Sequence, residues 1–512
     1  AQIEKPISST FSSLIARTPD DRMNMGGSQM IPDRIDLWFR NVILGEDQLR
    51  QRVAWALSQI MVVSDNGALL ELPWAVADYQ DMLSRNAFGN FRTLLEDVTL
   101  HPAMGIYLSM YGNQRAVEGT NLRPDENYAR EMMQLFSIGL VELNLDGTIK
   151  RDAAGQPIPT YNQDTIRGFA RVFTGWKAQC FSYVPRDQCF QRAYLVPWPN
   201  ESGFNQNQPM VIHEAFHEQG TKQLLVYPGV LLPGGLVPAN QGGVKDLQLA
   251  LDNVFHHPNV APFISKQLIQ KLVTSNPSPD YVRRVAEVFN NDGSGRRGNL
   301  EAVVRAILLD SEARGAATGA QAAYAGKLKE PLLRLTQLWR AYNARSASGK
   351  IGAARNFAGG AAAVFGQAQG SSPSVFNFFS PFFAPSGEIA DAGRVAPEMQ
   401  IATEYANTQI ANFFWVQSLS RTQLATTLNA DDMFINTTDE LAIAADSEAL
   451  VNRVAEKLLG GSTQMSAALK SETKAQIERT AVPTTNPTTA LATRTADAIY
   501  LIVTSPEFAL QR

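Results

Sequence analysis

The sequence predicts a mainly α-helical protein, and three observations support this. Apolar residues recur at helical spacing through most of the chain, as they do at Leu49, Val53, Leu57 and Ile60. Capping residues and Pro stand near the starts of such segments, and Gly, Pro and Asn separate them. Residues 177–245 differ, because they lose this periodicity and gain Pro, Gly, Gln and aromatic residues. We therefore predict a multi-helix globular protein with a smaller, irregular, β-containing insertion.

Changes in composition divide the chain into six predicted segments. They are an extended lead-in (1–30), an N-terminal helical lobe (31–176), the insertion (177–245), a second helical lobe (246–345), a Gly/Ala- and Phe-rich connection (346–395) and a C-terminal helical segment (396–512). A chain of 512 residues is long enough for two or more lobes. From Gly352 to Gly370, 12 of 19 residues are Ala or Gly. That stretch is either a partly ordered linker or a helix packed through small residues.

Charge and hydropathy exclude two classes of protein. The chain has 45 basic and 49 acidic residues, a net charge of −4, whereas nucleic-acid-binding proteins usually carry a basic field. No run approaches the roughly 18–20 apolar residues that span a bilayer. The chain begins at Ala1-Gln2 without Met, a basic n-region or an apolar h-region. We expect an exported protein, periplasmic or extracellular, whose signal peptide has been removed.

The densest cluster of polar side chains lies on a predicted helix over 125–139. Asp125 is a good N-cap, and Gly139 suits a left-handed C-terminal turn. The apolar stripe comprises Tyr128, Met132, Leu135 and Phe136, and the opposite face carries Glu126, Asn127, Arg130, Glu131 and Gln134. Two interpretations are open. The face is a solvated set of ion pairs, or it is a catalytic site in which Glu126 or Glu131 is the acid or base and Arg130 and Asn127 position it.

The insertion contains His213-Glu-Ala-Phe-His217, a His-Glu-x-x-His sequence. In zinc proteases this motif places two His on one helix face, with the Glu as general base. Here that role would fall to His213, His217 and Glu214, although the neighbouring residues favour a strand and a loop over a helix. The alternative is a loop in which His217 and Lys222 make polar contacts, with or without a functional role for His217.

Two further pairs of alternatives concern ligands and crosslinks. Cys180 and Cys189 are the only cysteines, and in an exported protein they predict a local disulfide more readily than a metal pair.

Asp146-Gly147 predicts a hairpin turn between Leu143 and Thr160. Oxygen-bearing side chains around this turn suit either turn hydrogen bonds or a calcium ion, although the EF-hand spacing is absent; they are Asn144, Asp146 and Asp152.

Five phenylalanines crowd the segment from Pro373 to Pro385; they are Phe376, Phe378, Phe379, Phe382 and Phe383. Large aromatic side chains mostly fill cores, which predicts a plug between lobes. If several of them are exposed, they mark a surface for a partner protein, a lipid or a glycan.

Several of these segments resemble one known family. Residues 124–139, Pro-Asp-Glu-Asn-Tyr-Ala-Arg-Glu-Met-Met-Gln-Leu-Phe-Ser-Ile-Gly, resemble the Asn-Glu-Asn-Tyr-Ala-Arg-Glu-Leu…Leu-Gly signature of the bacterial domain of unknown function 1800. Segments 101–108, 164–176, 217–222, 373–376 and 505–508 resemble its other motifs in the same order. Asp125 and Glu218 depart from the signature, which has Asn and Asp there. The resemblance implies an exported protein associated with a second exported family similar to sulfatases and phosphatases. It supplies no catalytic residues.

Two functional hypotheses follow. In the first, the protein is an accessory or binding protein that engages an extracellular polymer or a phosphatase- or sulfatase-like partner protein. In the second, it hydrolyses an exported polymer by carboxylate acid/base chemistry, with His217 and Lys222 contributed by the insertion. A zinc-dependent variant of the second would use His213, Glu214 and His217. Apart from the zinc and calcium alternatives, no cofactor is predicted.

Overall fold

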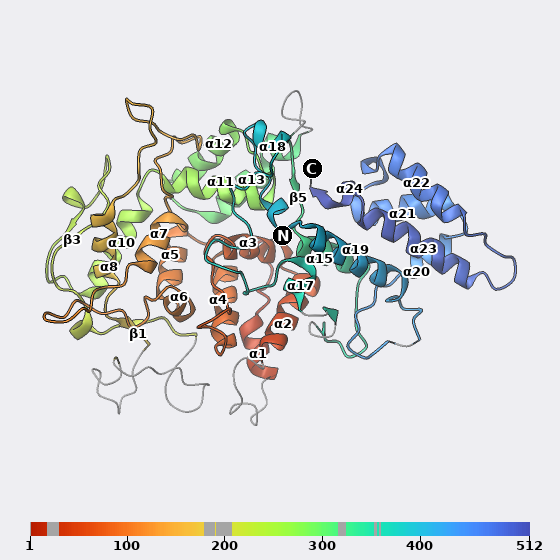
Figure 1. Ribbon diagram of the computed structural model, residues 1–512, viewed down its shortest axis with the longest axis horizontal. Helices are drawn as coiled ribbons and strands as arrows, with labels where there is room; N and C mark the ends of the chain where they lie inside the picture. The colour runs from red at the N-terminus through yellow and green to blue at the C-terminus, as the bar shows by residue number, and fades with distance from the viewer. Residues whose placement is uncertain are drawn as a thin grey trace.

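The helical periodicity of the sequence is realised as helices in the computed structural model, which describes residues 2–17, 30–178, 190, 207–315, 324–352, 356–357, 360–426 and 428–511. The described residues are mainly helical and form three small two-stranded sheets, so the predicted fold class is confirmed. The helices lie along an elongated molecule, with β3 near one end and α20, α22 and α23 at the other (Figure 1).

The helices of the first 315 residues begin at capping side chains where the sequence supplies them. Asn90, Asn162, Ser278 and Asn299 each accept a hydrogen bond from a first-turn backbone N–H, which satisfies a donor that has no partner within the helix. The helices are α1 (Thr10–Arg17), α2 (Ile31–Leu44), α3 (Gln48–Ser58), α4 (Pro73–Asn86), α5 (Phe91–Leu100), α6 (Pro102–Tyr107), α7 (Asn127–Gln134), α8 (Gln163–Val172), η3 (Glu214–Phe216), η4 (Pro233–Gly235), α10 (Gly243–Phe255), α11 (Val260–Leu272), α12 (Pro279–Asn290), α13 (Leu300–Leu309) and α14 (Ser311–Arg314).

The remaining helices follow the same rule, with caps at Thr403, Asp446, Ser466 and Ser505. They are α15 (Pro331–Ala341), α17 (Ala361–Phe365), α18 (Glu388–Asp391), η6 (Pro397–Ile401), α19 (Glu404–Leu419), α20 (Thr438–Ile443), α21 (Ser447–Leu459), η7 (Ser462–Gln464), α22 (Ala467–Glu478), α23 (Thr488–Val503) and α24 (Pro506–Ala509).

All three sheets are antiparallel pairs of two-residue strands. Two belong to the insertion or its edge, which confirms that it contains β-structure: β1 (Trp176–Lys177) pairs with β2 (Val211–Ile212), and β3 (Lys222–Gln223) pairs with β4 (Leu236–Val237). In the third sheet, β5 (Lys327–Leu328) pairs with β6 (Leu510–Gln511), which ties the end of the chain to its middle.

The described residues bury two large hydrophobic cores. One is built mainly from α3–α8 and α10–α13, and the other from α2, α15, α17, α19 and α21–α24. Helix α2 therefore packs with the C-terminal half of the chain. The Trp38 and Trp55 rings, from α2 and α3, lie 5.2 Å apart in the second core. Since Val53 and Leu57 of α3 enter the first core, α3 joins the two.

Two expectations about local structure need correction or refinement, and a third lies outside the described residues. The lead-in is not wholly extended, because α1 forms there and Leu14 packs with Trp74 in a small third core. Part of the Gly/Ala-rich stretch is ordered as α17, whose Ala361 and Phe365 are buried in the second core. Cys180 and Cys189 lie outside the described residues, so the disulfide stays a prediction. In the described part of the chain, no helix is long and apolar enough to cross a membrane.

Candidate functional site

The predicted helix at 125–139 is shorter than expected, and its two ends explain why. Helix α7 covers only Asn127–Gln134, and the Asp125 carboxylate accepts a 2.8 Å hydrogen bond from the Asn127 backbone N–H. Beyond Gln134 the chain forms a tight turn in which the backbone N–H groups of Ile138 and Gly139 both donate to Met133. Gly139 has φ +74°, as expected, and a Cβ there would meet the Phe263 ring.

Glu126 lies in a partly solvated network on α7. Its Oε2 is 3.1 Å from Arg130 Nη2, and Gln163 Nε2 donates to both of its carboxylate oxygens, at 2.8 and 3.0 Å. Arg167 approaches the same carboxylate at 3.9 Å. This arrangement agrees with the surface interpretation for Glu126, Asn127 and Arg130, and such pairs contribute only ~0.2–1 kcal/mol each.

Glu131 differs from its neighbours, because it is 7% exposed instead of lying on the solvated face. Burial raises the pKa of its carboxyl, and Arg130 only partly opposes this. Its Oε2 has no hydrogen-bond partner among the described residues. Burial, together with the Glu131 charge, also raises the pKa of Tyr107, and raises that of Tyr161 to about 12. Glu131 is therefore a sheltered carboxyl group close to two phenols.

His217 and Lys222 do come together, through a third residue that no sequence motif singles out. Asp246, in the first turn of α10, accepts from both: its Oδ2 is 3.0 Å from His217 Nε2 and 2.5 Å from Lys222 Nζ. All three side chains are at most 1% exposed. Because a buried charge is tolerated only when it is paired, this trio binds the insertion to the helical body.

The Thr174-Gly175-Trp176 segment cradles this trio. His217 Nδ1 is 2.8 Å from the Thr174 carbonyl oxygen, and Thr174 Oγ1 accepts from the Glu218 backbone N–H. Gly175 has φ +83°, and a Cβ there would lie 3.0 Å from His213 O and from His217. A glycine is therefore needed for the close approach of the two segments.

The His213–His217 segment does not adopt the geometry that the zinc hypothesis requires. Glu214–Phe216 forms a single 3-10 turn instead of an α-helix. His213 Nε2 faces the Ala178 carbonyl oxygen at 3.2 Å, His217 Nε2 faces Asp246, and Glu214 Oε1 accepts from the Gly243 backbone N–H. Within the described residues, no group of three or more His, Cys, Asp or Glu is placed to hold a metal ion.

The turn at Asp146-Gly147 forms the predicted hairpin, with bridges between Leu143 and Ile149 and between Val141 and Pro159. Its oxygen-bearing side chains make local turn hydrogen bonds. Asp146 Oδ1 accepts from Thr148, Asp152 Oδ1 accepts from the backbone N–H groups of two following residues, and Asn144 Nδ2 donates to Thr148 Oγ1. These bonds agree with the turn interpretation of the segment.

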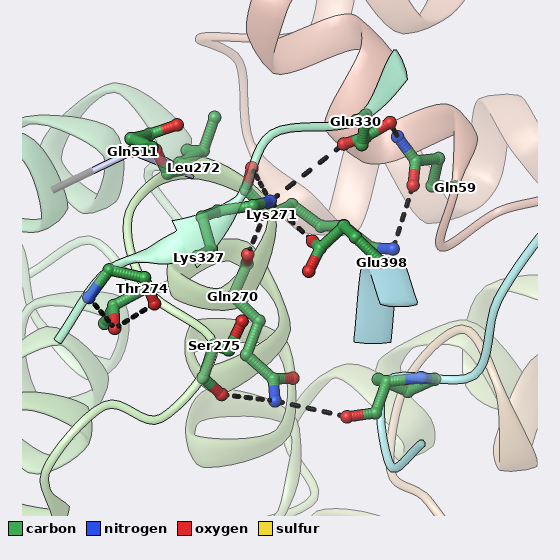
Figure 2. Close-up of polar contacts among 12 residues, drawn as sticks. Gln59, Gln270, Lys271, Leu272, Thr274, Ser275, Lys327, Glu330, Glu398 and Gln511 are labelled. Carbon is green, nitrogen blue, oxygen red and sulfur yellow. Dashed lines mark hydrogen bonds and ion pairs between the residues drawn. The ribbon is translucent and has the colours of Figure 1, made fainter. Parts of the chain in front are cut away.

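A second group of buried charges, which we call the Lys271 cluster, lies where the two cores meet. It comprises Gln59, Lys271, Lys327, Glu330 and Glu398 (Figure 2). Lys327 Nζ is 2.8 Å from Glu398 Oε1 and 4.0 Å from Glu330 Oε1, and it donates to the carbonyl oxygens of Gln270 and Lys271. Lys271 Nζ donates to Gln59 Oε1 at 2.9 Å.

Burial dominates the electrostatics of this cluster. It lowers the pKa of Lys271 to about 7, because Glu330 and Glu398 only partly offset the cost of burying the ammonium. Burial alone would raise the pKa of Glu330, yet Lys327, Arg52 and Lys271 hold it below its usual value. Glu330 Oε2 also accepts hydrogen bonds from Trp55, Gln59 and Gln367. Glu330 is thus an ionised carboxylate surrounded by hydrogen-bond donors and basic side chains.

The phenylalanine segment is held against the Lys271 cluster, and we call its residues 374–383 the Phe loop. Phe379 is 1% exposed, with the Lys271 ammonium 3.9 Å from its ring centroid. Asn377 Nδ2 donates to Gln59 Oε1, and the Pro381 carbonyl accepts from Gln270. The loop therefore has a buried anchor.

Two phenylalanines of the Phe loop face solvent: Phe376 is 56% exposed and Phe382 is 68% exposed. The prediction that this segment plugs the core is thus confirmed for Phe379 and wrong for these two. The physical reason is local. The Ser374 and Ser380 hydroxyls accept from the backbone N–H of the phenylalanine two residues later, and these turns direct the chain outwards.

These features describe a mainly helical protein with buried ionic groups, among them the His217 trio and the Lys271 cluster, and a loop that displays aromatic rings. The chain belongs to the family described as "Protein of unknown function (DUF1800)", whose model matches residues 3–510. Neither a curated protein nor a solved structure was found to match it.

Proposed function

We propose that this protein binds an extracellular polysaccharide, with the rings of Phe376 and Phe382 as stacking surfaces. The observation that carries the proposal is the exposure of these two rings on a loop whose middle is anchored by a buried third ring. Exposed aromatic rings offer flat apolar faces, and the apolar faces of sugar rings are their natural complement. Singly exposed apolar residues are common on surfaces, so the way in which these two are held is the informative feature.

The Phe loop presents the two rings in the same way. Phe376 follows Ser374 and Phe382 follows Ser380, and each serine hydroxyl accepts a 3.2 Å hydrogen bond from the phenylalanine N–H. In each turn the serine carbonyl also accepts from the residue after the phenylalanine, Asn377 or Phe383. Because the backbone is already fixed, less conformational entropy is lost when a ligand binds. Two rings that are held in the same way suit a polymer whose sugar units repeat.

The test is a binding screen against soluble polysaccharides, read by affinity electrophoresis. We expect Phe376→Ala combined with Phe382→Ala to weaken binding about 10- to 100-fold, since each lost aromatic contact is worth ~0.5–1.5 kcal/mol. The matched control is Leu231→Ala, which removes a side chain that is 70% exposed within the insertion, away from the Phe loop. That variant should bind like the wild type.

Retention of full affinity in the double variant would overturn the proposal. If no polysaccharide is retarded, and the double variant instead abolishes capture of a purified phosphatase- or sulfatase-like partner, the loop is a protein-docking site. Both outcomes are distinguishable from misfolding, because the rings are exposed and circular dichroism should be unchanged.

A second candidate function, hydrolysis of such a polymer, is favoured by Glu131. A buried carboxyl with a raised pKa and an unpaired oxygen has the properties of a general acid. If the protein is a hydrolase, we expect Glu131→Gln to lower the release of reducing ends from the bound polymer at least 100-fold. Glu126→Gln, in the solvated network on the same helix, should leave it near the wild-type rate. Equal rates for wild type and Glu131→Gln would exclude Glu131 as the acid.

A further inference from the structure

A cavity of about 600 Å³ lies between α2, α3 and α15, with Lys457 of α21 and Gln511 of β6 in its wall. This volume is within the range of small-molecule sites, roughly 300–1,000 Å³. The cavity lies apart from α7, the buried His217 trio and the Phe loop, none of which contributes to its lining. No feature of the sequence indicated it, because its walls come from both ends of the chain.

The charge of the lining is one-sided. Its ionisable side chains are all basic: Arg52, Lys329, Arg340 and Lys457. Two of these already have acidic partners, since Lys457 Nζ is 2.7 Å from Glu440 and the charges of Glu330 and Glu398 act on Arg52. Lys329 and Arg340 have no acidic partner among the described residues. The lining therefore has positive charge that the protein itself does not neutralise.

The electrostatics of these two residues agree with this description. Burial and, to a smaller extent, the charge of the neighbouring Arg334 lower the pKa of Lys329 to about 8. Partial burial also lowers the pKa of Arg340, whose side chain still reaches solvent, and no acid opposes that effect. An anion between them would reverse these shifts, because an opposite charge stabilises the protonated form.

The lining also has uncharged polar groups. Four amide side chains complete the polar wall: Gln48, Gln51, Gln337 and Gln511. Their nitrogens already donate to protein oxygens, and Gln337 Oε1 accepts from Lys329 Nζ at 2.9 Å. The amide oxygens of Gln48, Gln51 and Gln511 are left to accept from hydroxyl groups.

We propose that this cavity binds a small, hydroxyl-rich anion, namely a sugar that carries a phosphate or a carboxylate. Lys329 and Arg340 pair with the anionic group, and the remaining glutamine amide oxygens accept hydrogen bonds from the hydroxyls. Trp38 and Trp55 contribute the aromatic part of the lining. This site shares no residue with the proposed polymer surface, so either proposal can fail while the other stands.

The test is isothermal titration of the full chain with four probes: glucose 6-phosphate, glucuronate, inorganic phosphate and glucose. We expect at least one anionic sugar to bind, and to bind more tightly than both phosphate and glucose. Comparison of glucose 6-phosphate with glucuronate then distinguishes a phosphate from a carboxylate ligand. Arg340→Gln should weaken that binding about tenfold or more, as expected for a lost hydrogen bond to a charged group.

Two variants control the measurement. Lys329→Gln should weaken binding as Arg340→Gln does, whereas Arg283→Gln, a partly exposed arginine of α12 outside the cavity, should not. Arg340 is exposed, so its loss should not disturb folding. The proposal is overturned if neither anionic sugar binds at millimolar concentration. It is also overturned if inorganic phosphate or glucose binds equally well, or if Arg340→Gln leaves the affinity unchanged.

Discussion

Asp246→Asn is expected to destabilise the protein by about 3–5 kcal/mol, the usual cost of removing one partner from a buried ion pair. Lys222 is wholly buried, and its ammonium would keep only the Gly220 carbonyl as a strong acceptor. His217 would lose the carboxylate that faces its Nε2. Thermal melting followed by circular dichroism should show a fall of several degrees in the midpoint.

A surface aspartate provides the control. Asp280→Asn on α12 removes a carboxylate that is 72% exposed and pairs with Arg283, so its effect should stay below ~0.5 kcal/mol. Adding Lys222→Met to Asp246→Leu should recover part of the lost stability, because no unpaired charge then remains from this pair. A midpoint for Asp246→Asn equal to that of Asp280→Asn would show that the trio does not hold the insertion in place.

Lys271 is expected to make the protein more stable as the pH rises from 7 towards 10. Below pH 7 its amine is protonated in both the folded and the unfolded chain. Between its folded pKa of about 7 and an unfolded value near ~10.4, only the unfolded chain keeps the proton. The unfolded state then binds more protons, so the free energy of unfolding increases with pH, by up to ~4 kcal/mol from this group.

Urea unfolding at several pH values between 6 and ~10 measures this effect. Lys271→Met should remove the contribution of Lys271 to the rise in the free energy of unfolding with pH. Lys245→Met, which replaces an exposed lysine of α10, should keep the wild-type dependence of that free energy on pH. Lys329, with a pKa of about 8, contributes in the same window and remains in both variants, so the difference between them isolates Lys271. If the free energy of unfolding rises equally with pH in Lys271→Met and in the wild type, the Lys271 ammonium is not destabilised by burial.

Local patterns in the sequence predicted the helices well and the polar sites only in part. Gly139 was placed correctly, because a left-handed residue after a helix is a local requirement. The pairing of His217 and Lys222 with Asp246 was not predicted, since Asp246 looks like an ordinary first-turn acid. The sequence places Glu131 on the polar face of its helix and leaves open whether solvent or protein covers it, because a helical wheel does not show which neighbours pack over a turn.

One local feature of the sequence points to the Lys271 cluster. Lys271 follows Ile264 and Leu268 on the apolar stripe of α11, so a lysine stands where a core residue is expected. Its partners Glu330 and Glu398 lie in distant segments, and only the tertiary structure brings them together. The cavity lined by Arg340 depends on the same long-range assembly of chain segments.

The most direct test of the proposed function is hydrogen–deuterium exchange, with and without an oligosaccharide of the polymer that binds. The backbone N–H groups of Phe376 and Phe382 donate to the Ser374 and Ser380 hydroxyls, and a ligand stacked on the two rings should slow their exchange. We predict protection of the peptide covering 374–383, lost in the double alanine variant. Protection elsewhere, with exchange in 374–383 unchanged, would contradict the assignment of the Phe loop as the binding surface.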